Sequence, residues 1–170
     1  MIQRITGCVA VLMGSYGVGL MLLHNEKCQE QALEDLQQCI IWMTWQLRYQ
    51  MLPLAELCNS AAAQHGGIIG NVMGNLSQLL DKRGFADPGQ CMQEAVLSVG
   101  DIPDQALLRL YELGQSMGQF DLDSQISSLE LTALHCERDL EFIRNNMEHR
   151  RRNYRTLSLC AGAAVVIILL

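Results

Sequence analysis

The most reactive side chains in this sequence are seven cysteines, but their spacing favours packing over catalysis or metal binding. They are Cys8, Cys28, Cys39, Cys58, Cys91, Cys136 and Cys160. No two lie closer than the eleven positions between Cys28 and Cys39, so the paired spacing of a zinc site is missing. The odd count also argues against a closed set of disulfides, so we expect small core residues in a reducing compartment.

Histidines and carboxylates also lack the spacing that chemistry needs. The histidines stand alone, without the HxxxH or HxxE spacing that puts two ligands on one face: His24, His65, His135 and His149. Three carboxylates follow His135 closely: Glu137, Asp139 and Glu141. Neighbours one or two apart on a helix point to different faces, so these residues predict a solvated charged face. With no glycine-rich phosphate loop either, we expect no catalytic residue, no metal, no cofactor and no enzymatic activity.

Charge is distributed unevenly along the chain. Residues 24–143 hold six Lys/Arg and seventeen Asp/Glu, whereas residues 144–155 hold five arginines against Glu148. An acidic body cannot neutralise phosphates, so nucleic acid is excluded as a partner.

Both ends of the chain are apolar enough to suggest membrane segments. Ile5 to Leu23 is a run of 19 residues without a charge, within the length that spans a bilayer. Leu157 to Leu170 is uncharged but short, so the helix before it must supply an extra turn. We expect membrane segments at 1–24 and 156–170, a helical bundle at 25–155, and the lipid membrane as a partner. A cleaved signal peptide is the alternative for the first segment, although no small-x-small site precedes His24.

A basic cluster before the second apolar run predicts the orientation of the chain. It consists of Arg150, Arg151, Arg152 and Arg155. Basic residues beside a span stay on the cytoplasmic side, so the bundle should be cytoplasmic and both termini should lie across the membrane.

The apolar pattern between the two ends has a period of 3.6 residues, which predicts an all-α antiparallel bundle of about six helices. The first should cover residues 29–50, Pro53 should start the second, and the third should cover about 69–80. Asp87 with Pro88 and Asp101 with Pro103 should begin the fourth and fifth. The expected buried residues are Leu33, Leu36, Ile40, Met43, Leu47, Leu54, Leu57, Cys58, Ala61, Cys91, Met92, Ala95, Val96, Val99, Ala106, Leu107, Leu110 and Leu113.

The sixth helix has the clearest pattern, an unbroken heptad seam. Its apolar residues alternate spacings of four and three: Leu122, Ile126, Leu129, Ala133, Cys136, Leu140, Ile143 and Met147. No proline or glycine follows before Gly162, so the helix should continue into the second apolar segment. Of the two tryptophans in the first helix, one should pack inside, and the other should cover a neighbouring helix or contact a partner.

The chain resembles the stage III sporulation protein AB family over nearly its whole length. The resemblance rests on the N-terminal apolar segment, Pro53-Leu54-Ala55-Glu56, and Tyr154-Arg155-Thr156-Leu157 before a glycine-containing tail. Its most specific part is a corner before the sixth helix: Leu113, Gly114, Gly118, Asp121 and Gln125. Trp42, Trp45 and Gln46-Leu47 depart from the charged stretch that the family has there.

The resemblance implies a fold similar to the cytoplasmic domain of GspF, the platform protein of type II secretion, which is a six-helix bundle. It also implies a non-enzymatic scaffold of the mother-cell to forespore channel complex. The chain would lie in the outer forespore membrane, with its bundle in the mother-cell cytoplasm. Implied partners are a SpoIIIAA-like cytoplasmic ATPase and other channel-complex proteins, and self-association is left open. The alternative from another class is a small membrane-anchored sensor or ligand-binding helical bundle.

The corner residues are expected to be structural before they are functional. Gly118 should adopt a positive φ to end the fifth helix, and Gly114 should allow a neighbouring helix to approach closely. Asp121 or Asp123 should cap the sixth helix.

Overall fold

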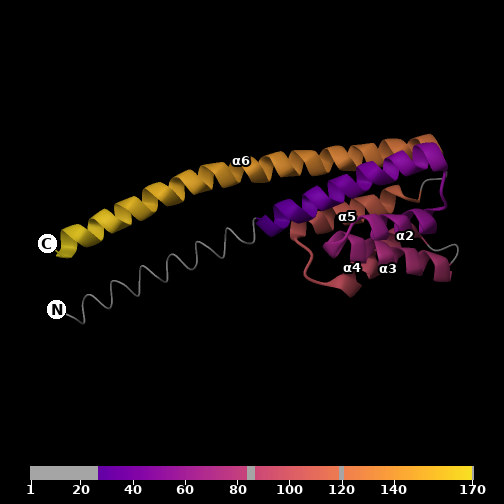
Figure 1. Cartoon of the computed structure of the whole chain (residues 1–170), viewed down its shortest axis with the longest axis horizontal. Helices are drawn as coiled ribbons and strands as arrows, with labels where there is room; N and C mark the ends of the chain where they lie inside the picture. Colours follow the sequence, from indigo (N-terminus) through magenta and orange to yellow (C-terminus); the bar gives the residue numbers. More distant parts are fainter. Residues whose placement is uncertain (1–26, 84–86, 119–120, 170) are drawn as a thin grey trace. The chain divides into compact units, whose positions relative to one another are not determined.

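A computed structural model describes the backbone of residues 27–83, 87–118 and 121–169, and the side chains of residues 27–82, 87–118 and 121–146. These residues form six helices and no strand, as the sequence predicts. Residues 27–50 form the first. The others are α2 (Leu54–Gln64), α3 (Gly67–Arg83), α4 (Pro88–Val99), α5 (Asp104–Ser116) and α6 (Leu122–Leu169) (Figure 1).

The chain divides into two compact units, of which one contains the bundle. This unit covers residues 29–141, somewhat less than the expected 25–155. The two ends of the chain form the other unit, of which the structure describes residues 27–28 and 142–169. Within the described part of the chain, no helix has the length and hydropathy of a membrane span. The expected segment at 1–24 lies outside the described residues.

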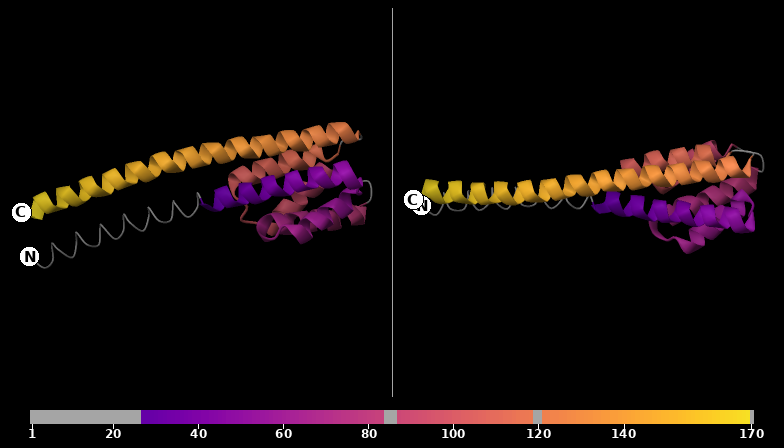
Figure 2. Two further views of the ribbon diagram at one scale, coloured as in Figure 1. Left: turned by 45° about the horizontal axis from the view of Figure 1, so that its top comes forward. Right: turned by 90° about the horizontal axis from the view of Figure 1, so that it is seen from above.

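Consecutive helices pack on one another through the middle of the bundle, α2 on α3, α3 on α4 and α4 on α5. The 27–50 helix and the first part of α6 run side by side in opposite directions, although they are far apart in the sequence (Figures 1 and 2). The bundle unit is therefore closed by two helices from its two ends.

The core consists of the apolar faces that the sequence predicts. All five expected residues of the 27–50 helix are buried. The exceptions elsewhere are half-buried: Leu54, Val99, Leu107, Leu122 and Ala133. The first four lie in an end turn of a helix or one turn from it, where fewer neighbours cover a side chain. Met147 lies outside the described side chains.

The helix ends follow local chemistry. Asp87 caps α4, because its Oδ1 accepts a hydrogen bond of 3.2 Å from the amide of Gly89, and Pro88 takes the first helical position. Pro53 and Pro103 precede α2 and α5 rather than starting them. Gly100 ends α4 with φ 64° and ψ 174°, a conformation almost confined to glycine.

The end of α5 differs from the expectation that Gly114 and Gly118 close the fifth helix. The helix continues through Gly114 to Ser116, so Gly114 is an internal helix residue. α6 is helical without a break from Leu122 to Leu169, as the lack of proline and glycine before Gly162 predicts.

Candidate functional site

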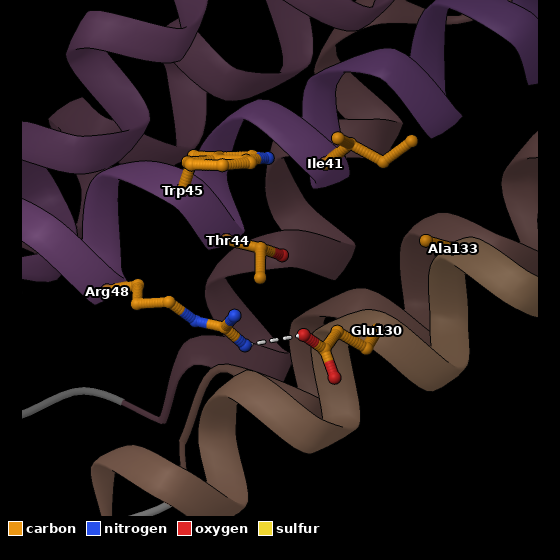
Figure 3. Close-up of a pocket in the computed structure, with 6 residues that line it drawn as sticks. All are labelled: Ile41, Thr44, Trp45, Arg48, Glu130 and Ala133. Atoms are coloured by element: carbon orange, nitrogen blue, oxygen red, sulfur yellow. Dashed lines mark hydrogen bonds and ion pairs between the residues drawn. The ribbon is translucent and has the colours of Figure 1, made fainter.

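A shallow groove lies between the 27–50 helix and α6, and we call it the Trp45 groove (Figure 3). It encloses about 160 Å³. Its lining residues are Ile41, Thr44, Trp45, Arg48, Glu130 and Ala133. All six belong to the bundle unit.

The groove is hollow because two small residues form its floor. Thr44 is buried, and its hydroxyl donates a hydrogen bond of 2.8 Å to the carbonyl oxygen of Ile40, one turn back. Ala133 occupies a position of the heptad seam but carries only a methyl group. The seam is therefore underfilled at this point, although its period is unbroken.

Large apolar side chains continue from the groove along the exposed face of the 27–50 helix. Ile41, Trp45 and Tyr49 follow at intervals of four residues, which places them in one stripe. Trp45 is 59% exposed and Tyr49 69%, and their rings stack with centroids 5.2 Å apart. Trp42 behaves differently, because it is half-buried and meets His65 edge-on at 6.0 Å. Exposed aromatic residues in a row are typical of protein interaction surfaces.

A row of acidic residues begins at one edge of the Trp45 groove and continues along α6. Glu130 of α6 forms a 2.7 Å ion pair with Arg48, and both side chains are 54% exposed. Glu137 and Glu141 follow on the same face of α6 at intervals of seven and four, and both are exposed. We call these three glutamates the acidic row.

The corner before α6 brings the family-motif residues together through packing. Leu113 is fully buried, and Gly114 lies against α4. A Cβ added at Gly114 would lie 2.6 Å from the Cβ of Met92 and 3.5 Å from the Cα of Gly89. Gly114 therefore allows α5 to approach α4 more closely than any other residue would.

The remaining corner residues join the end of α5 to the start of α6. Asp121 Oδ2 accepts hydrogen bonds from the amide of Ser124 at 3.2 Å and from its hydroxyl at 2.9 Å. Gln125 Nε2 donates to the carbonyl oxygen of Met117 at 3.2 Å. Asp121 thus caps α6, and Gln125 holds the end of α5 beside it.

The expectation that Gly118 adopts a positive φ is wrong. Positive φ values among the described glycines occur at Gly67 and Gly100. A Cβ at Gly118 would meet Pro88 at 3.5 Å, an ordinary contact. α5 ends instead at Ser116, and the next residue, Met117, has a φ of −71° that any residue can adopt, so the corner needs no left-handed glycine.

A second polar cluster joins α5 to α6 and was not predicted from the sequence. Arg109 Nε donates to Asp139 at 2.7 Å, and its other nitrogen donates to Glu112 at 2.6 Å. The other oxygen of Glu112 lies 2.6 Å from His135 Nδ1. The hydrogen bond to Asp139, ahead of the one to Glu112, raises the pKa of Arg109 and keeps it charged.

The sequence did contain a signal for this cluster. Arg109 and Glu112 are three apart on α5, and His135 and Asp139 are four apart on α6, so each pair shares a face. The prediction of a solvated face holds for Glu137 and Glu141, which are exposed, but not for Asp139, whose side chain is 22% exposed and paired. Since every group in the cluster has a partner within the bundle, it acts as a clamp between two helices.

The cysteines of the bundle behave as core residues. Those described form no disulfide, and Cys39, Cys58, Cys91 and Cys136 are fully buried. Burial raises the pKa of Cys39, Cys58 and Cys136 to about 12, so these thiols are poor nucleophiles near neutral pH. The described residues contain no group of three potential metal ligands. The side chains of Arg150, Arg151, Arg152 and Arg155 lie outside the described residues.

Comparisons with known proteins give one family and one solved structure. The family model described as stage III sporulation protein AB matches residues 4–170. A solved structure titled stage III sporulation protein AB (SpoIIIAB) superposes with a TM-score of 0.63 at 17% identity. The match covers 72% of this chain and 98% of that one, and at this identity it supports the fold. Comparison with curated protein sequences gives no significant match.

Proposed function

Because this chain belongs to the stage III sporulation protein AB family, we propose that it is a non-enzymatic scaffold of the mother-cell to forespore channel complex. In this role its helical bundle couples a cytoplasmic secretion-type ATPase to the membrane apparatus. The observation that carries the proposal is the family match over residues 4–170, which spans the bundle and both apolar ends.

We further propose that residues 1–24 and 156–170 anchor the chain in the outer forespore membrane, with the bundle at 25–155 in the mother-cell cytoplasm. The uncharged run of 19 residues near the N-terminus and the arginines before Leu157 support this topology. Both termini then lie on the side of the membrane opposite the bundle.

The geometry of the bundle supports a binding role. The corner residues and the Arg109 cluster have partners inside the fold, so their polar groups hold helices in place. The Trp45 groove instead leaves aromatic and aliphatic surface exposed beside charge. Such a surface is what a scaffold offers to another protein.

The ligand-binding alternative gains no support from the groove. Pockets that hold small molecules enclose roughly 300–1,000 Å³ and bury most of the ligand. The Trp45 groove encloses about 160 Å³ and is open to solvent along one side.

Mild crosslinking of sporulating cells, followed by capture of the full chain from the membrane fraction, tests the scaffold role. We expect the captured material to contain a secretion-type ATPase. Recovery of the chain in the membrane fraction without any ATPase would refute the coupling role.

A labelling experiment tests the topology independently. Gly66 lies in the turn between α2 and α3, and a Cβ there would meet nothing within 4 Å, so Gly66→Cys should fold normally. With Cys28→Ser removing the thiol that is exposed among the described side chains, an impermeant maleimide should label position 66 only after the mother-cell membrane is opened. Position 66 is mapped by mass spectrometry. Labelling from the opposite side of the forespore membrane would reverse the topology.

A further inference from the structure

We propose that the Trp45 groove binds an amphipathic helix of a partner protein, whose apolar stripe fills the hollow and whose basic residues face the acidic row of α6. This inference names the chemistry of a partner, and to that extent it rests on the proposed scaffold function. It concerns the surface formed by the 27–50 helix and α6 within the bundle unit (Figure 3).

The apolar half of the argument is the shape and composition of the groove. A hollow of about 160 Å³ above Thr44 and Ala133 has room for one large aliphatic or aromatic side chain. Ile41 and Trp45 form the wall beside it, and Tyr49 extends the wall by another turn. Because these residues repeat every four positions, the wall matches a helix that presents anchors at similar intervals.

The polar half of the argument is charge. Glu130 lines the groove, and the acidic row continues from it along the same face of α6 through Glu137 to Glu141, over about three helical turns. Arg48 balances Glu130 at one end, and Arg138, the basic residue that α6 carries between Glu130 and Glu141, lies about 100° around the helix from Glu137. A partner helix with lysine or arginine beside its apolar stripe would complement this edge.

The same charges disfavour two other occupants. Residues 29–141 hold five basic and sixteen acidic residues, so a second copy would bring like charge to the groove. An anionic membrane surface would be repelled by the acidic row for the same reason. A basic amphipathic helix is therefore the occupant that the surface fits best.

The test uses the full chain in phosphatidylcholine nanodiscs and a synthetic peptide helix of about 18 residues, with leucine in one stripe and lysine elsewhere. The chain has two tryptophans, so Trp42→Phe leaves Trp45 as the sole reporter. Binding should shift Trp45 emission to the blue and protect it from acrylamide. A peptide with glutamate in place of lysine should bind at least about tenfold more weakly.

Two exposed positions provide a matched pair of variants. Ile41→Ser removes the wall of the groove and should weaken peptide binding about tenfold, the loss expected for one buried aliphatic side chain. Leu97→Ser removes a leucine that is 77% exposed on α4, outside the groove, and should leave binding within about twofold. Replacing Glu137 and Glu141 together with lysine should reverse the preference between the two peptides. Circular dichroism checks that each variant remains folded.

The proposal is overturned if the acidic peptide binds as well as the basic one, or if both serine variants lose binding equally. It is also overturned if the chain without peptide dimerises with a blue shift of Trp45 that Ile41→Ser abolishes, since the occupant is then a second copy. The fluorescence measurement involves no ATPase. Loss of ATPase capture by the unmodified chain would therefore refute the proposed function and leave this result unaffected.

Discussion

Gly114 is a residue at which a single added methyl group should disturb the packing between two helices. The Cβ of alanine would lie 2.6 Å from the Cβ of Met92, which is fixed to the α4 backbone and cannot rotate away. Gly114→Ala must therefore push α5 from α4, and we expect a loss of about 1–3 kcal/mol of unfolding free energy. Urea unfolding followed by tryptophan fluorescence measures this loss, because both tryptophans lie in the bundle unit.

Gly118→Ala is the matched control, with the same chemical change four residues later. Its Cβ would make an ordinary contact of 3.5 Å with Pro88, so the unfolding midpoint should move little. Equal losses for the two variants would show that the approach of α5 to α4 does not set the stability of the corner.

Met51 has a strained backbone conformation, so replacing it with glycine should stabilise the bundle. It has φ 48°, in the left-handed region, immediately after the 27–50 helix, and its side chain is exposed. Met51→Gly should raise the unfolding free energy by about 1 kcal/mol, since glycine adopts this conformation without a steric penalty. Asp101 also has a positive φ of 43°, but aspartate tolerates it better, so Asp101→Gly should gain less in the same urea titration.

Between elements, the ion pair that joins α5 to α6 and the ion pair in the Trp45 groove allow the effect of burial on stability to be compared. Arg109–Asp139 and Arg48–Glu130 have the same N–O distance of 2.7 Å. The first pair is 18% and 22% exposed, whereas both members of the second are 54% exposed. A double-mutant cycle with Arg109→Met and Asp139→Asn should give a coupling energy of about 1 kcal/mol, because water screens this pair less.

The equivalent cycle with Arg48→Met and Glu130→Gln should give a coupling of less than about 0.5 kcal/mol. A coupling as large as that of the α5–α6 pair would show that the groove pair is stabilised by more than surface attraction.

The helices were predictable because their apolar period and their capping residues point to the same elements. Asp87 with Pro88 and the leucine seams determine local structure without help from distant residues. The positions of Gly114 and Gly118 were harder, since nothing in the local sequence says which of two glycines faces another helix. The Trp45 groove was also missed, because Ala133 keeps the heptad period while leaving space that only the partner helix reveals.

For the whole bundle, the buried thiols predict a loss of stability in alkaline solution. Burial raises the pKa of Cys39 and Cys58 from 9.0 to about 12. Below pH 9 these thiols are protonated in both states, so the folded state keeps its full stability. Above pH 9 the unfolded chain loses the protons first, and stability falls until the pH passes about 12.

Urea midpoints measured from pH 8 to pH 10.5 should therefore decline. The decline should be shallower in the variant with both cysteines replaced by alanine. Each protein is compared with its own midpoint at pH 8, because the substitutions also create small cavities that lower stability at every pH. If the urea midpoints of the two proteins declined in parallel, other groups, such as the tyrosines, would be responsible for the alkaline sensitivity.

The pairing of the first described helix with the last also affects synthesis on the ribosome. Arg48 and Glu130 are 82 positions apart, whereas α2 to α5 each pack on their neighbour in the sequence. Ribosomes add about 5–20 residues per second, so the side of the 27–50 helix that faces α6 stays uncovered for roughly 4–16 seconds until the facing part of α6 has been synthesised. A nascent chain halted before residue 122 would therefore keep this side of the helix uncovered and available to a chaperone, and completion of α6 would end that exposure.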